Sequence, residues 1–330
     1  MKIELNVLLV LLCFTIKAQH DSSYYYSYKS KITARLYFSN KSTSLFIKNI
    51  DGLYNLNYKP NTTRNIGIGA TYKSFTLNLA GGFSFLNPEA GRGKTRYLDL
   101  QFHQYGRKLI IDVFGEFYKG FYLSPKGYGN TNGHYYLRPD LRINEVGASV
   151  QYVLNSKRFS YRASFLQNEW QRKSAGSFLL GFEAYAGNVV TDSSIFPTIV
   201  SQQIASRNYN RVNFFELGPN IGYAYTLVFK KHFFATGSAS LSLDAGNNII
   251  KRNIKDDHTS GFSTNVLCRI SAGYNSYLWA ISVFYITNNI HLASQSFEKK
   301  IQFNTTNFRI NFIRRIAPGK KVGKYLKWIR

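Results

Sequence analysis

Charged side chains stand in the middle of several stretches that otherwise alternate between apolar and polar residues. In a strand, alternate side chains share a face, so these charges are expected together on polar faces. Buried charges persist when they are paired, which predicts a structural salt-bridge network; the alternative is a water-filled path whose charges select ions or solutes. The residues concerned are Asp99, His103, Asp112, Glu116, Glu145, Arg158, Arg162, Glu183, Arg269 and Arg309.

A second pattern with chemical meaning is the pair His258 and Ser260. This spacing places both side chains on one face of a strand, as a general base beside a nucleophile requires. The pair resembles the His-x-Ser arrangement of outer-membrane lipid acyl hydrolases, which implies ester hydrolysis as an alternative function. Those enzymes also orient the histidine with an Asn or Glu, and residues 266–274 contain neither, while Asn265 is a poor substitute in register.

Other motifs predict no cofactor and no metal. The segment 91–95 (GRGKT) suggests a phosphate-binding loop, but Pro88 occupies the position of the required first glycine and no helical pattern follows. The other histidines have no metal-ligand spacing: His103, His134, His232 and His291. We therefore expect a protein that is not an enzyme, with the hydrolase kept as the alternative.

The elements that must position these residues are strands. Period-2 alternation runs through residues 97–103, 109–117, 146–152 and 158–165. Many segments reach about ten residues, the length that a tilted strand needs to cross a bilayer, whereas soluble strands most often have five or six. The same period-2 alternation repeats in 66–83, 178–186, 233–243, 266–274, 277–286 and 303–312.

The connections between these strands alternate in length. Short turns are expected at Lys73, Gly106, Ser156, Lys230 and Asn275, and longer loops near 85–94, 119–139, 168–175, 244–260 and 287–300. Short periplasmic turns and long extracellular loops are typical of outer-membrane barrels. We therefore predict an all-β, antiparallel transmembrane β-barrel of about twelve strands, with fourteen as the alternative. A second long connection over 187–209 leaves the count open, and a soluble periplasmic β-sandwich that binds a ligand is the alternative fold.

The two ends of the chain differ from the barrel in composition. Residues 1–18 combine Lys2, a short apolar run and Ala18, which predicts a cleaved signal peptide and export. Residues 19–30 form a polar, Tyr-rich segment, 31–316 the barrel, and 317–330 a basic tail that is either solvated or bound to anionic lipid. After cleavage, Cys268 is the single cysteine, so no intrachain disulfide is expected.

Composition narrows the function classes. The chain has 330 residues, with 42 Lys or Arg and 17 Asp or Glu, a net charge of +25 and 16% aromatic residues. This excludes a disordered chain and a coiled coil. For an exported protein, the charge predicts contact with phosphates of outer-membrane lipid and lipopolysaccharide, or simply solubility, and not nucleic acid. Loop residues that could serve are Lys119, Lys126, Arg172, Lys173, Lys251, Arg252, Lys299 and Lys300.

Four stretches carry a family resemblance: YKPNTTRNIGIGATYKSFTLNLAGGF (58–83), KTRYLDLQFHQYGRKLIIDVFGEFYKGFY (94–122), RKSAGSFLLGFEAY (172–185) and LGPNIGYAYTLVFKKHFFATGSASL (217–241). The chain resembles an uncharacterised family of Gram-negative outer-membrane β-barrel proteins, filed as a domain of unknown function. The resemblance implies the fold and the outer-membrane location but no catalytic residues. We expect a monomer, inserted by the barrel assembly machinery, that is a structural or narrow-pore barrel or binds an anionic solute in a charged lumen.

Overall fold

The computed structural model describes residues 20–28, 30–50, 54–73, 75–86, 90–129, 132–203, 209–251, 256–294 and 301–319. The predicted signal peptide, Arg252, Lys299, Lys300 and the tail beyond residue 319 lie outside these ranges. Most of the described chain is β-structure, and a two-stranded sheet accompanies one large sheet. No helix within these ranges is long and apolar enough to cross a membrane.

Ten strands of the large sheet close a ring through antiparallel hydrogen bonds. In order around the ring they are β2 (Ile32–Ile50), β17 (Ile301–Ile316), β16 (Trp279–His291), β15 (Val266–Asn275), β12 (Phe233–Ser242), β11 (Arg211–Phe229), β10 (Ala175–Val190), β8 (Leu137–Val153), β7 (Leu109–Ser124) and β3 (Tyr54–Lys59). The expected all-β antiparallel barrel is thereby confirmed. The strands form one closed sheet, so the two-sheet sandwich finds no support.

Three more strands lie beside this ring, between β2 and β7. β4 (Arg64–Tyr72) pairs with β2 and with β5 (Phe75–Gly82), while β6 (Arg96–Tyr105) pairs with β7. A short 3-10 turn, η1 (Ser84–Leu86), follows β5. β13 (Asp244–Lys251) and β14 (Asp257–Ser263) form a hairpin that extends the sheet beside β11. The count of twelve strands stays a prediction, because the ring closed by hydrogen bonds contains ten.

The alternation of the sequence places polar residues inside and apolar residues outside. In β12, Thr236, Ser238 and Ser240 are buried on the inner face, whereas Phe233 and Leu241 are about half exposed on the outer face. The pattern repeats along β11, where Ile221 is 55% exposed and Asn220 is buried. An apolar exterior around a polar interior reverses the arrangement of a soluble protein and is typical of membrane barrels.

The segment 158–165 was expected to be a strand, and 168–175 a loop at the long-loop end; both expectations are wrong. The chain folds instead as α2 (Tyr161–Phe165) and β9 (Glu169–Gln171), at the end of the short turns. Ser160 caps the helix by accepting a hydrogen bond from the Ala163 N–H at 3.1 Å. Tyr161 and Phe165, four residues apart, pack ring to ring at 4.6 Å.

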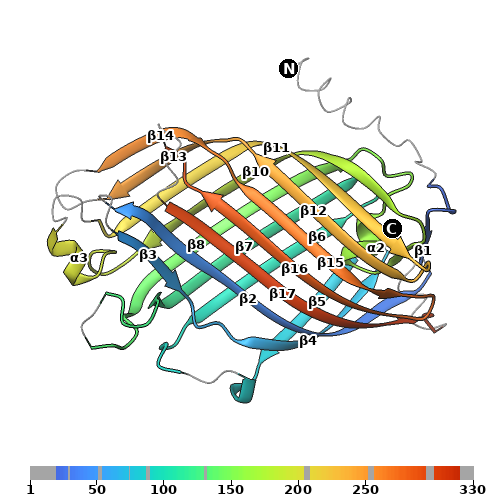
Figure 1. Ribbon diagram of the computed structural model, residues 1–330, viewed down its shortest axis with the longest axis horizontal. Helices are drawn as coiled ribbons and strands as arrows, with labels where there is room; N and C mark the ends of the chain where they lie inside the picture. Colours follow the sequence, from blue (N-terminus) through green and yellow to red (C-terminus); the bar gives the residue numbers. More distant parts are fainter. Residues whose placement is uncertain are drawn as a thin grey trace.

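Because 158–165 is not a wall strand, the long connection over 187–209 falls at the end of the long loops. β10 continues to Val190, and the connection that follows contains α3 (Thr198–Gln203). Figure 1 shows α2 and β1 (Tyr25–Ser27) at one end of the barrel, and α3, β3, β13 and β14 at the other. We call these the α2 end and the α3 end.

The outer apolar face generates a first prediction. Ile221→Arg on β11 is expected to lower the free energy of unfolding in phospholipid vesicles by about 2–4 kcal/mol, because arginine near the bilayer midplane meets hydrocarbon. Ile199→Arg on α3, at a residue that is also exposed, is the control and is expected to change it by about 0.5 kcal/mol or less. Denaturant titration measures both, and equal effects would mean that the β11 face is in water.

Candidate functional site

A first cluster of charges surrounds Asp112 on the inner face of β7. Arg269 Nη2 donates to Asp112 Oδ2 at 2.6 Å, and His103 Nδ1 lies 2.6 Å from Oδ1. The Tyr105 hydroxyl donates to Oδ1 at 2.9 Å. Arg269 also donates to the Tyr161 hydroxyl of α2 at 2.6 Å. The cluster therefore joins three wall strands to the helix inside the barrel.

A second cluster is centred on Lys41 of β2. Its Nζ lies 2.7 Å from Asp99 Oδ2 and 2.6 Å from Glu116 Oε1. Thr43 and Thr305 donate further hydrogen bonds to Glu116. Sequence reasoning missed Lys41, because Ser, Thr and Asn surround it and hide the alternation that marked the other inward charges.

Several inner-wall carboxyl groups form no ion pair with a cation among the described residues. Glu145 is directly opposite Glu116 in the β7–β8 register, is 1% exposed, and neither of its carboxyl oxygens has a hydrogen-bond partner among the described residues. Glu183 accepts from the Asn220 amide at 2.9 Å. Glu216 and Asp244, which sequence reasoning missed, are fully buried and accept from Ser263 and Ser242. Glu216 stands within a stretch, 212–221, that alternates between apolar and polar residues, and this position was the sequence signal that could have identified it as an inward charge.

The opposite wall carries arginines that form no ion pair within the described ranges, although Asp99 attracts Arg309 from beyond ion-pair distance. In the described part of the chain, no carboxylate forms an ion pair with Arg35, Arg309 or Arg315. The Arg309 guanidinium lies 4.5 Å from the ring centre of Tyr37 and 5.2 Å from that of Phe284. Gly67 of β4 permits this packing, because a Cβ there would collide with the Tyr37 ring. The Arg309 guanidinium is thus stabilised by cation–π contacts with two aromatic rings, which leave its positive charge in place.

Residues 154–174, which contain α2 and β9, fill the α2 end and form what we call the α2 plug. Every residue from Ala163 to Glu169 is buried. Arg35 donates to the Leu166 carbonyl at 3.1 Å, and Arg315 to the Gln167 carbonyl at 2.5 Å. Backbone carbonyls of the plug therefore accept hydrogen bonds from two wall arginines, and the plug is tied to β2 and β17.

The N-terminal segment lies against this plug. β1 pairs antiparallel with β9, and the Tyr25 hydroxyl donates to the Ser156 carbonyl at 2.9 Å. The Tyr28 hydroxyl donates to the Ser276 carbonyl at 2.6 Å. Burial raises the pKa of Tyr28, so the hydroxyl keeps the proton that it donates. The Tyr-rich lead is therefore a structural part of the α2 end.

The α3 end is filled by apolar side chains. Ile195, Phe196 and Val200, from the connection between β10 and β11, are buried in the larger apolar core. Arg138 holds the same connection by donating to the Ser194 carbonyl at 2.8 Å, while Asp140 accepts from its guanidinium at 2.8 and 2.9 Å. The wall residues that meet this α3 plug (Ile195–Val200) include Leu45, Tyr58, Leu141, Ile143, Val212 and Phe303.

Two cavities lie against the charged inner wall. A central cavity of about 80 Å³ is lined by Asp112, Glu116 and Arg269. A larger one of about 460 Å³, which we call the seam cavity, extends toward β5 and β6 and is lined by Arg309 and Asp99. The two share the lining residues Lys41, Gln101, His103 and Asn307.

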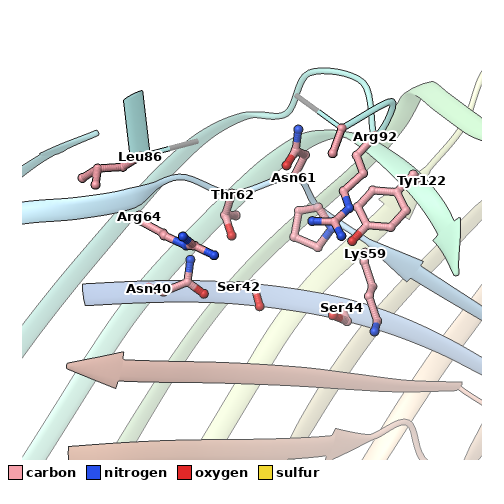
Figure 2. A pocket seen from close by; sticks show the side chains of 12 residues that line it. Asn40, Ser42, Ser44, Lys59, Asn61, Thr62, Arg64, Leu86, Arg92 and Tyr122 are labelled. Atoms are coloured by element: carbon pink, nitrogen blue, oxygen red, sulfur yellow. The ribbon is translucent and has the colours of Figure 1, made fainter. Parts of the chain in front are cut away.

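A third cavity, of about 420 Å³, lies outside β2, where β3 leaves it for β7. Figure 2 shows Lys59, Arg64 and Arg92 around it, with Asn61 and Tyr122. The Arg92 guanidinium lies 5.7 Å from the Tyr122 ring centre. None of the described lining residues is acidic. We call this the basic pocket.

The structure joins some of the ten predicted charges and separates others. Asp99 with Glu116, and His103 with Asp112 and Arg269, form the two clusters above. Arg158 and Arg162 were expected on a strand of the wall, which is wrong, because that segment belongs to the α2 plug. Arg158 is exposed, 5.2 Å from the Tyr24 ring centre, and Arg162 lies 3.7 Å from Glu169 within the plug.

The candidate hydrolase residues belong to neither of these clusters. His258 and Ser260 share the outer face of β14 at the α3 end, and both are exposed. Within the described ranges, no hydrogen bond joins them, and no group of three or more His, Cys, Asp or Glu could hold a metal ion. Their predicted catalytic role stays a prediction.

The Asp112 cluster generates a second prediction. Arg269→Met is expected to lower the free energy of unfolding by about 3–5 kcal/mol, because it leaves Asp112 buried without its cation. Adding Asp112→Leu is expected to restore more than half of that loss. Denaturant titration of the folded protein measures this, with the exposed Lys173→Met as control, expected within about 0.5 kcal/mol. A double variant as unstable as the single one would contradict the pairing.

Several solved structures align with most of this chain. The outer membrane protease OmpT from Escherichia coli is 11% identical, with a TM-score of 0.35 over 88% of this chain and 97% of that one. The Pseudomonas putida toluene transporter TodX is 7% identical, with a TM-score of 0.23 over 88% and 91%. At such values neither protein informs the activity of this chain. No curated protein matches the sequence. The family model described as a domain of unknown function, DUF4421, matches residues 19–315, so the chain belongs to that family.

Proposed function

We propose that the protein is an outer-membrane barrel in which β4, β5 and β6 complete the wall. Their outward residues are exposed and apolar: Ile66, Ile68, Leu77, Leu79, Leu98, Leu100 and Phe102. The crossing strands would then be β2, β4, β5, β6, β7, β8, β10, β11, β12, β15, β16 and β17, which is the predicted number of twelve. The short turns of the α2 end would face the periplasm.

Within this barrel, we propose a binding site for a small anionic group at Arg309. The observation that carries it is that Arg309 lines the seam cavity and forms no ion pair with a carboxylate among the described residues; the Asp99 carboxylate, which lines the same cavity, attracts it only from beyond ion-pair distance. Lys41 and Arg269 are already paired with carboxylates, whereas Arg35 and Arg315 donate to carbonyls of the α2 plug. Arg309 is thus, of the inner-wall arginines named here, the one that neither an ion pair nor a plug carbonyl engages, and it is available to a ligand carboxylate or phosphate.

The two plugs favour binding over passage along the barrel axis. The α2 plug is fixed by buried arginine–carbonyl hydrogen bonds, and the α3 plug by an apolar core. We therefore propose a barrel whose lumen is closed at both ends in this conformation and whose role is not catalytic.

Titration calorimetry with hexanoate tests the anion site. Arg309→Gln is expected to weaken hexanoate binding at least about tenfold, because the charge-assisted hydrogen bond is lost, while Arg309→Lys keeps part of it. Arg314→Gln is the matched control, since this arginine lies on the same strand but on the exposed outer side. Equal binding by wild type and Arg309→Gln would remove the proposed site.

A planar bilayer measurement tests axial closure separately. We expect the inserted protein to give no discrete conductance steps, because both ends are packed with side chains. Insertion is verified by the heat-dependent electrophoretic mobility of the recovered protein. Regular conductance steps would refute closure and restore the narrow pore as the function.

The basic pocket supports a second proposed interaction, with phosphate groups of lipopolysaccharide. Three cationic side chains line it, on the outer side of β2 toward the α3 end. Lys59→Gln with Arg92→Gln is expected to reduce lipopolysaccharide binding roughly tenfold or more. Lys119→Gln with Lys126→Gln, outside the pocket, is the control. Competition by inorganic phosphate distinguishes a free phosphate site from a lipid site, and equal loss in both double variants would reduce the interaction to net charge.

A further inference from the structure

The wall has a seam between β5 and β6. β5 is hydrogen-bonded to β4 and β6 to β7, but in the described chain no ladder joins β5 to β6. Backbone groups without partners are tolerated at membrane depth where they line a water-filled cavity. The seam cavity supplies such a space, because polar side chains line its inner part: Ser39, Lys41, Asn78, Asp99, Gln101 and Arg309.

The residues that line this cavity come from both faces of the wall. Leu98 and Asp99 are adjacent on β6 and point to opposite sides of the sheet, yet both line it. Leu77 of β5 lines it as well, and Leu77 and Leu98 are each 54% exposed on the outer face. Small residues border the β5 side: Ala80 and Gly82 both line the cavity and are exposed.

The cavity therefore presents two chemical environments to one ligand. Its inner part holds Arg309, which forms no ion pair with a carboxylate among the described residues, and its outer part holds leucines on the face that we assign to lipid. With both ends of the barrel plugged, the described structure opens the inner site sideways, toward the membrane. A purely water-soluble anion would use only the inner half.

We infer that the β5–β6 seam binds a single-chain amphipathic anion, with its head group on Arg309 and its acyl chain passing between the strands along Leu77 and Leu98. This inference rests on the proposed anion site and names the ligand class for it. Head and chain contribute separately: the head forms a charge-assisted hydrogen bond, and the chain buries apolar surface. The affinity should consequently rise with chain length in a manner that depends on the seam residues.

The test compares hexanoate with palmitate, each corrected for partition into the detergent micelle. Wild type is expected to bind palmitate at least about tenfold more tightly than hexanoate, because additional methylene groups are buried. Leu77→Gln with Leu98→Gln should abolish this gain while hexanoate binding stays as in wild type. Leu79→Gln with Leu100→Gln is the matched control, since these leucines are exposed on the same two strands but do not line the cavity.

A second variant and a labelling measurement keep the test valid if the Leu77→Gln, Leu98→Gln variant does not fold. Leu77→Ala with Leu98→Ala should reduce the palmitate gain in the same direction. A palmitate carrying a photoreactive group at its terminal carbon should label β5 or β6 in wild type, as mapped by mass spectrometry.

The outcomes separate the two proposals. If the palmitate gain survives in the Leu77/Leu98 variants, or falls equally in the Leu79/Leu100 control, the seam assignment is overturned, while Arg309-dependent hexanoate binding still supports the anion site. If hexanoate does not bind wild type, the anion site fails and the seam assignment fails with it. Loss of the gain in the Leu77/Leu98 variants alone, with labelling of β5 or β6, supports both.

Discussion

Closing a sheet with its apolar face outward is the constraint on which the rest of this structure depends. Once the outer face is given to leucine, isoleucine and phenylalanine, the alternate residues of every strand must point inward. Charged side chains in that interior are costly unless they are paired. Lys41 and Arg269 meet this requirement by pairing with carboxylates from β6 and β7, across the interior from their own strands.

The interior arginines that lack carboxylates meet the same requirement in a different way. Arg35 and Arg315 donate to main-chain carbonyls of the α2 plug, so the plug replaces solvent for these two side chains. Tyr161 extends the arrangement by accepting from Arg269. The plug and the wall therefore depend on each other: without the plug, several wall arginines would need water, and without those arginines the plug carbonyls would lose their donors.

The sequence was sufficient for the barrel and for most of the inward charges, because both follow from period-2 alternation, which is local. It failed at 158–165, where apolar residues at 159, 161, 163 and 165 fit a strand, while 161 and 165 also have helical spacing. The helix is favoured because Ser160 caps it and because its apolar side chains are buried inside the barrel. Lys41 was hidden among small polar residues. The seam could not be foreseen, since alternation predicts strands but not which neighbours pair.

The seam and the plugs are connected by one physical argument. A complete ring of paired strands with two packed ends would enclose its charges and leave them no access to a ligand. Here β3 closes the ring at the α3 end. Toward the α2 end, the β4–β5 hairpin and β6 lie between β2 and β7, and within the described chain β5 and β6 are not hydrogen-bonded to each other. The unpaired edges fall beside Arg309, which among the described residues forms neither an ion pair with a carboxylate nor a hydrogen bond to a plug carbonyl. An incomplete wall and an incompletely neutralised charge thus occur at the same place, which is the arrangement that a laterally entered binding site requires.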